Sequence, residues 1–103
     1  MNGWSDMYEY TEDNVDSYAP SSAGVYRLLY KKDNKYYIFY IGQSDDLQRR
    51  LQEHLNPSES DKCIKKHLKE YNCYFEFLEV EKQSDRDKIE QEEINKWQPC
   101  CNN

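Results

Sequence analysis

The chain has little of what marks disordered, fibrous or membrane proteins. Its 103 residues include only three glycines and three prolines, a composition that argues against a disordered or fibrous chain. No apolar run approaches the roughly 20 residues that a membrane helix needs. Residues 1–10 carry two acidic residues and no apolar block, unlike a signal peptide. We therefore expect a soluble, cytoplasmic protein with no membrane partner.

The chain also lacks cysteine spacings typical of metal sites. Cys63, Cys73, Cys100 and Cys101 include no Cys-x-x-Cys pair, and the two histidines do not have zinc-finger spacing. A zinc site needs four ligands that converge tetrahedrally. The sequence therefore favours ordinary thiols in a reducing compartment. A metal module built on the four cysteines stays as an alternative that zinc analysis would test, and Cys100 and Cys101 lie beside a functional segment described below.

An excess of positive charge, typical of DNA-binding proteins, is missing as well. The net charge is −6. Residues 26–70 hold ten Lys or Arg against seven acidic residues, whereas residues 1–25 hold five acidic residues and no basic one. The middle of the chain could present a basic face. Charge alone favours the alternative that these residues only solvate helices.

What the chain has is aromatic residues, which make up 15% of it and include ten tyrosines. Its length fits one domain with a modest core. Residues 1–22 are acidic and polar with scattered aromatics, which indicates an N-terminal arm that packs its rings against a domain at residues 23–103. Tyrosine suits such positions because its ring can be buried while its hydroxyl is hydrogen-bonded.

The order of predicted elements is β-β-α-α-β-α, an α+β domain with a three-stranded antiparallel or mixed sheet flanked by helices. Aromatic and β-branched residues at 24–31 and 36–42 predict a β-hairpin. Helices are expected at 46–55 and 60–70, and the alternation at 73–81 predicts the third strand. Ser84 is expected to cap a last helix that Pro99 ends.

Helical geometry identifies candidate site residues on two helices. On a wheel with Ile89 at the origin, Glu90 falls at about 100° and Glu93 at about 40°, both inside the apolar arc. A carboxylate there is costly to bury unless it has partners or binds a metal, so both are candidates. In the first helix Arg50 and His54 are neighbours beside the leucine stripe. The alternative is that Arg50 only covers the edge of the core and His54 is a surface or capping residue.

Several motifs in order resemble those of the GIY-YIG nuclease family. Gly24-Val25-Tyr26 and, fourteen residues after Tyr26, Tyr40-Ile41-Gly42 resemble its paired signature. Arg50 and His54 match the family's first helix. Its closing block is matched by Glu90, Pro99 and Asn102, so the resemblance covers most of the chain.

The resemblance implies the GIY-YIG fold and metal-dependent hydrolysis of phosphodiester bonds in DNA, with one Mg²⁺ or Mn²⁺ ion. It makes Glu90 the metal ligand, in preference to Glu93. One carboxylate and several waters suit Mg²⁺. Arg50 would hold the scissile phosphate in two contacts. Asn102 would anchor the site by hydrogen bonds.

The family's two tyrosines correspond to Tyr26 and Tyr40. One of them should orient or deprotonate the attacking water, and the sequence does not choose between them. A tyrosine needs help to act as a base at pH 7 because its free pKa is about 10. The metal or His54 would supply that help. Gly42, like Gly24, would let backbone approach closely.

Directly paired residues project on the same face of a hairpin. Tyr26 and Tyr40 therefore share a face only if the residue numbers of the two members of each pair sum to an even number. An odd-numbered loop satisfies this condition, and we predict Asp33-Asn34-Lys35.

One departure from the family is Gln43, where many relatives carry lysine. A neutral amide can donate a hydrogen bond to phosphate but supplies no charge. We expect Gln43 to contact substrate and Lys35, Lys62 or Lys65 to compensate for the missing charge.

The predicted function is thus a DNA endonuclease, with branched or damaged DNA as candidate substrates and a targeting protein as a candidate partner. The alternative is a nucleic-acid-binding or protein-interaction module that keeps the fold with weak or no nuclease activity. The complete set of motif residues favours the enzyme. Gln43, the acidic balance and the lack of a DNA-binding domain in this sequence favour the module.

Overall fold

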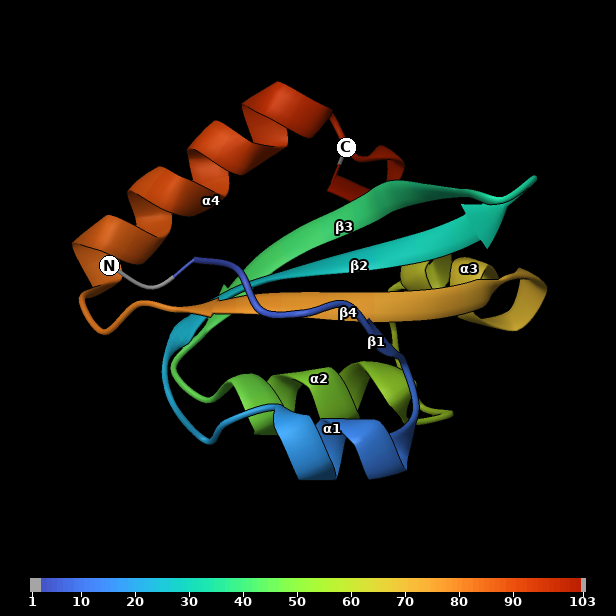
Figure 1. The fold of residues 1–103 in the computed structure, drawn as a ribbon, viewed down its shortest axis with the longest axis horizontal. Helices are drawn as coiled ribbons and strands as arrows, with labels where there is room; N and C mark the ends of the chain where they lie inside the picture. The colour runs from blue at the N-terminus through green and yellow to red at the C-terminus, as the bar shows by residue number, and fades with distance from the viewer. Residues whose placement is uncertain (1–2, 103) are drawn as a thin grey trace.

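The sheet has four antiparallel strands in the order β1-β4-β2-β3, in a computed structural model that describes residues 3–102. The elements along the chain are β1 (Tyr8–Glu9), α1 (Glu12–Tyr18), β2 (Gly24–Lys32), β3 (Lys35–Ser44), α2 (Leu47–Leu55), α3 (Lys62–Glu70), β4 (Asn72–Glu79), α4 (Gln83–Trp97) and the 3-10 turn η1 (Cys100–Asn102). Helix α4 lies over one face of the sheet, and α1 and α2 lie over the other (Figure 1). The predicted α+β class is confirmed.

The prediction of three strands is wrong by one, because the short strand β1 adds to the sheet. Tyr8 pairs with Phe75 of β4, and α1 follows with Thr11 capping it through the amide of Asn14. Two residues are too few for the alternation that identifies a strand. Tyr10, just after β1, donates its hydroxyl to the carbonyl of Leu51 at 2.6 Å.

The division into an N-terminal arm at residues 1–22 and a domain at residues 23–103 stays a prediction. Residues 1 and 2 of the arm and residue 103 of the domain lie outside the described residues. No helix among residues 3–102 is long and apolar enough to span a membrane.

The predicted loop of the hairpin is also wrong, although the predicted register is confirmed. Asp33 and Asn34 alone form the turn, both with positive φ (53° and 63°), as a type I′ turn requires. A bulge then changes the pairing, from Leu29↔Ile38 to Leu28↔Tyr40. The bulge inserts one extra residue and so restores the even sum that places Tyr26 and Tyr40 on one face.

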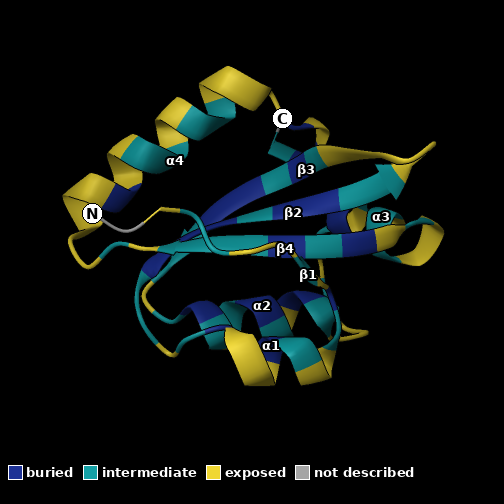
Figure 2. Cartoon of the chain, viewed as in Figure 1, coloured by how far each residue is buried: buried dark blue, intermediate teal, exposed yellow. Residues whose placement is uncertain are grey.

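Helices α2 and α3 begin where an acidic side chain accepts hydrogen bonds from backbone N–H groups. Asp46 accepts from the amide of Arg49 at the start of α2, and Asp61 accepts from two amides at the start of α3. The expected cap of the last helix at Ser84 is wrong: α4 begins at Gln83 after Lys82, without a side-chain cap. Exposed residues follow the outer side of α4 (Figure 2). The helix ends at Trp97, and the next residue, Gln98, caps it with a φ of 47°.

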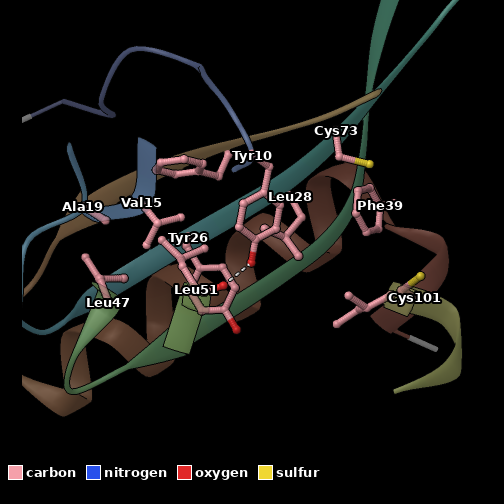
Figure 3. Close-up of a cluster of buried hydrophobic side chains, with 12 residues drawn as sticks. Tyr10, Val15, Ala19, Tyr26, Leu28, Phe39, Leu47, Leu51, Cys73 and Cys101 are labelled. Carbon is pink, nitrogen blue, oxygen red and sulfur yellow. Dashed lines mark hydrogen bonds between the residues drawn. The ribbon is translucent and has the colours of Figure 1, made fainter. Parts of the chain in front are cut away.

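The core lies between the sheet and the helices α1 and α2, where the strands place their apolar side chains. Figure 3 shows this cluster in close-up, with the hydrogen bond from Tyr10 to Leu51 drawn as a dashed line. Its members are buried, and several are completely so: Val15, Tyr26, Leu28, Phe39, Leu47, Leu51, Ile64 and Phe75.

Candidate active site

Tyr26 of β2 and Tyr40 of the neighbouring strand β3 lie together on one face of the sheet. Their ring centroids are 6.1 Å apart. Tyr26 is completely buried and Tyr40 on edge strand β3 is half-buried. Gly42, the partner of Tyr26 in the ladder, makes this packing possible, since a Cβ there would lie 2.5 Å from the Tyr26 hydroxyl. The predicted need for close approach at Gly42 is confirmed.

A hydrogen-bonded chain runs from Tyr26 through His54 to Glu59. The Tyr26 hydroxyl lies 2.7 Å from Nε2 of His54, and Nδ1 of His54 lies 2.8 Å from a carboxylate oxygen of Glu59. Because an ionised carboxylate only accepts hydrogen bonds, His54 donates from Nδ1 and Nε2 accepts from the tyrosine. His54 is buried, so its interpretation as a surface histidine is wrong.

Glu59 was missed from the sequence. It lies in the loop between α2 and α3, where no helical or strand period marks it. The amide of Asp61 donates to its second oxygen at 2.9 Å. Burial tends to raise the pKa of Glu59, but this amide and the hydrogen bond with His54 outweigh burial and lower it. Glu59 therefore stays ionised and holds the imidazole.

The pKa shifts of Tyr26 and His54 favour the neutral forms of both side chains at pH 7. Burial raises the pKa of Tyr26 well above 10, and Tyr40 adds to the effect. Burial also lowers the pKa of His54 from 6.5, with a further contribution from the charge of Arg50. The Tyr26–His54 pair thus carries no charge of its own. It can hold a proton in place but does not spontaneously release one.

Of the two tyrosines, Tyr40 is the one whose pKa is affected by the charges of both Arg50 and Glu90. Burial raises its pKa, the positive charge of Arg50 opposes the rise, and the negative charges of Asp61 and Glu90 add to it. Arg50 on α2 is partly exposed and donates to Glu53 at 3.1 Å. That contact leaves donors of its planar guanidinium available.

The structure separates the two acidic candidates of α4. Glu93 forms a salt bridge with Arg27 of β2, and Arg27 lies over the ring of Trp4 at 3.7 Å. Glu90 accepts a hydrogen bond from the amide of Gln43 at 3.0 Å and forms no salt bridge among residues 3–102. Glu90 is thus the half-buried carboxylate with oxygen lone pairs available, which suits a hard divalent cation that keeps most of its waters.

Gln43 faces α4 as well as the site. Its amide nitrogen also donates to Asp87 at 2.6 Å, and its oxygen accepts from Arg86 at 3.3 Å. Arg86 is buried and donates to the carbonyls of Val80 and Glu81. The predicted contact of Gln43 with phosphate stays a prediction, and here its amide orients Glu90.

Asn102 fixes the end of the chain to the edge strand. Its oxygen accepts from the amide of Ile41 at 2.9 Å, and its nitrogen donates to the carbonyl of Ile41 at 2.8 Å. Ile41 lies between Tyr40 and Gly42, so this paired contact holds the backbone that carries the site. The role is of the anchoring kind that the sequence suggested for Asn102.

The three lysines differ in position. Lys35 begins β3 five residues before Tyr40, so the two Cα atoms are about 16 Å apart along the strand. Lys62 begins α3 directly after Asp61, close to Glu59. Lys65 donates to the carbonyl of Pro57 at 3.0 Å. Lys62 and Lys65, together with Lys66, Lys69 and Glu70, line an exposed depression on α3.

Comparison with protein families gives a match to the GIY-YIG catalytic domain over residues 22–101. The chain belongs to the GIY-YIG family. This is a family of nucleases, and the match includes Tyr26, Tyr40, Arg50, His54 and Glu90. It ends one residue before Asn102.

Solved structures similar to this GIY-YIG domain include the N-terminal endonuclease domain of UvrC from Thermotoga maritima. One structure, of a point mutant bound to its catalytic divalent cation, is 25% identical, with a TM-score of 0.66 over 86% of this chain and 90% of that chain. Another, bound to magnesium, is 25% identical, with a TM-score of 0.65 over 86% and 91%. A comparison with curated proteins finds no significant match.

Proposed function

We propose that this GIY-YIG domain is a metal-dependent DNA endonuclease that hydrolyses phosphodiester bonds. The observation that carries the proposal is the position of Tyr40: a half-buried phenol on an edge strand, subject to the charges of both Arg50 and Glu90. Hydrolysis of a phosphodiester needs a positioned water, a counter-charge for the developing negative charge and help for the leaving oxygen. These groups are of the kinds required.

Glu90 is the residue that would hold one Mg²⁺ or Mn²⁺ ion, with the Gln43 amide fixing one of its oxygens. Such an ion, when bound, supplies Lewis-acid stabilisation of charge on the phosphate oxygens. The UvrC domain, which is similar to this chain, binds a catalytic divalent cation. A single carboxylate and a surrounding of water agree with the coordination that Mg²⁺ prefers.

Arg50 would hold the scissile phosphate. Its guanidinium carries a permanent charge and presents paired donors that match two phosphate oxygens. The contact with Glu53 is partly exposed, so it costs little to exchange for phosphate. Lys62 and Lys65 would add positive charge beside the bound DNA. This weak basic surface agrees with a low intrinsic affinity for DNA.

We assign the contact with the attacking water to Tyr40, because Tyr26 is completely buried and water does not reach it. Tyr26 is then a positioning residue: its hydroxyl donates to His54, and its ring packs beside Tyr40. A phenol whose pKa is raised is a poor base in the free protein. The charge of Arg50, together with the bound cation, favours the ionised form that base catalysis needs.

The test is cleavage of supercoiled, branched and single-stranded DNA with Mg²⁺ or Mn²⁺, with Glu90→Gln compared against Glu92→Gln. Glu92 lies on the exposed side of α4, so its variant controls for the loss of one acidic side chain. Loss of several kcal/mol of charge stabilisation should decrease the rate of DNA cleavage by Glu90→Gln roughly 100-fold or more. Glu92→Gln should cleave like the parent.

Equal cleavage by both variants would refute the role of Glu90. An absence of cleavage by folded parent protein on every substrate would favour the alternative, a nucleic-acid-binding or protein-interaction module. The acidic net charge and the contacts of Gln43 with Asp87 and Glu90 are the observations that support this alternative. Branched or damaged DNA as the preferred substrate, and recruitment by a targeting protein, are further proposals that the substrate panel and binding assays address.

A further inference from the structure

A cluster of sulfur and imidazole ligands is made of residues other than those assigned to the proposed nuclease site. It joins Cys63 and His67 of α3 with Cys100 and Cys101 of η1, and one ligand atom from each lies within 4.8 Å of all the others. The sulfurs of Cys63 and Cys101 form a disulfide in this structure. We propose that in the reduced protein these four side chains bind one structural Zn²⁺ ion.

The ligand set follows from the fold rather than from local spacing. Cys63 and His67 are four residues apart in α3 and therefore share a face of the helix. The turn η1 brings the adjacent Cys100 and Cys101 to that face, more than 30 residues further along the chain. Three cysteines and one histidine form a common structural zinc set.

Cys73 does not belong to the cluster, so the four-cysteine module considered from the sequence is wrong in its ligands. Cys73 is buried in the core, where burial raises the pKa of its thiol to about 12. Its sulfur donates to the carbonyl of His67 at 3.3 Å. Metals bind the thiolate form, and this thiol stays protonated.

His67 is held in the orientation that a metal ligand needs. Its Nδ1 lies 2.8 Å from the carbonyl of Cys63, and it donates there, because a carbonyl only accepts. This bond selects the tautomer with a free lone pair on Nε2, as for zinc-bound histidines that donate their other N–H to backbone. The ring stacks on Phe39 with centroids 4.7 Å apart.

The distance between His67 and Cys100 matches that of a tetrahedral site, and reduction of the disulfide would let the other ligand atoms move to fit one. Zn–S distances of about 2.3 Å and Zn–N distances of about 2.0 Å place ligand atoms roughly 3.5 to 3.8 Å apart. Nε2 of His67 lies 3.5 Å from Sγ of Cys100. The ligand atoms all lie within 4.8 Å of one another, so the widest separation must close by about 1 Å. The sulfurs of Cys63 and Cys101, which are bonded to each other in the disulfide, must separate to about 3.8 Å after reduction. Sγ of Cys101, which lies 3.6 Å from Nδ1 of His67, must also move toward Nε2.

Zinc and the disulfide exclude each other because both use the sulfurs of Cys63 and Cys101. A dithiol reductant converts the disulfide to two thiols by giving up two electrons and two protons, and is itself oxidised to a disulfide. Binding of Zn²⁺ then releases the protons of the coordinating thiols. A reducing compartment therefore favours the metal form.

The proposed zinc would secure the backbone that carries the nuclease site. It would join α3 to η1, and Asn102 of η1 pairs with Ile41, the residue next to Tyr40. The zinc site does not depend on the proposed nuclease activity, because its ligands are not the residues assigned to catalysis.

The test is the zinc content of protein purified with a reductant, measured by elemental analysis, together with the absorption spectrum after Co²⁺ replaces the metal. We expect about one zinc per chain and cobalt–thiolate charge-transfer bands. Glu90→Gln should keep both, because the Mg²⁺ site has no sulfur ligand. Cys73→Ala is the matched control for loss of a cysteine and should also keep both.

Cys100→Ser should lose most of the metal. His67→Cys, which replaces one ligand by another, should keep one zinc per chain and shift the cobalt bands toward those of a four-thiolate site. Because misfolded protein would lose the cobalt bands rather than shift them, the shifted spectrum of His67→Cys distinguishes a change of ligand from misfolding. Fully reduced, folded protein that contains less than about 0.1 zinc per chain and gives no cobalt–thiolate bands would overturn the proposal. Unchanged cobalt bands in His67→Cys would do so as well.

Discussion

Glu59→Gln tests whether the hydrogen-bonded chain behind Tyr26 contributes to catalysis. The carboxylate accepts from Nδ1 of His54 at 2.8 Å and from the amide of Asp61 at 2.9 Å. A carboxamide can instead donate to Nδ1, which would move the imidazole proton to Nε2 and deprive the Tyr26 hydroxyl of its acceptor. A hydrogen bond to a charged group contributes about 1.5 to 3 kcal/mol. At about 1.4 kcal/mol per factor of ten, we expect kcat/KM to fall roughly 10- to 150-fold.

The assay is Mg²⁺-dependent cleavage of the best DNA substrate over a range of concentrations, with Glu92→Gln as the control for loss of one negative charge. Thermal unfolding of each variant separates an effect on the site from an effect on the fold. If folded Glu59→Gln cleaves within about twofold of the parent, the carboxylate does not orient His54 in catalysis. The reasoning about the tautomer would then be wrong.

Three further predictions concern stability and pH. Tyr10→Phe removes a buried hydrogen bond and should cost about 1 kcal/mol, or about 5 °C in Tm for a chain of this length, whereas Tyr18→Phe at an exposed position should change Tm little. Gly42→Ala should lower both Tm and cleavage, since a Cβ 2.5 Å from the Tyr26 hydroxyl forces a shift that costs about 1 to 3 kcal/mol; unchanged Tm and cleavage would contradict the geometry. The pKa of His54 is lowered in the folded protein, so the unfolded chain binds the proton more readily and the free energy of unfolding should fall as pH drops below about 6.5. Urea unfolding between pH 7.5 and 5.5 measures this dependence, and the free energy of unfolding should change less with pH in His54→Asn.

Much of the fold was predictable because local patterns and tertiary packing agree. The alternation in β4 and the leucine period of α2 place apolar side chains on the face that the core requires. The turn of the hairpin was not predicted correctly. A bulge changes register without a marker in the local sequence, and it was the bulge before Tyr40 that decided which face its ring occupies.

The candidate site, like the fold, was only partly predictable from the sequence. The spacing of the two signature tripeptides, with Arg50 and Glu90, was enough to indicate the family, which the match over residues 22–101 confirms. Helical geometry alone left Glu90 and Glu93 equivalent. The resemblance to the family favoured Glu90, and packing supplies the physical difference, because Arg27 of β2 forms a salt bridge with Glu93.

The sequence by itself determined the class of fold, the family and the residues of its motifs, since each depends on composition or on spacing along one element. Tertiary structure alone decided the contacts between distant segments. Glu59 became a partner of His54 through the path of a loop, and Cys63 met Cys101 because η1 folds back against α3. Such contacts depend on where elements pack against one another, and neither helical nor strand periodicity contains that information.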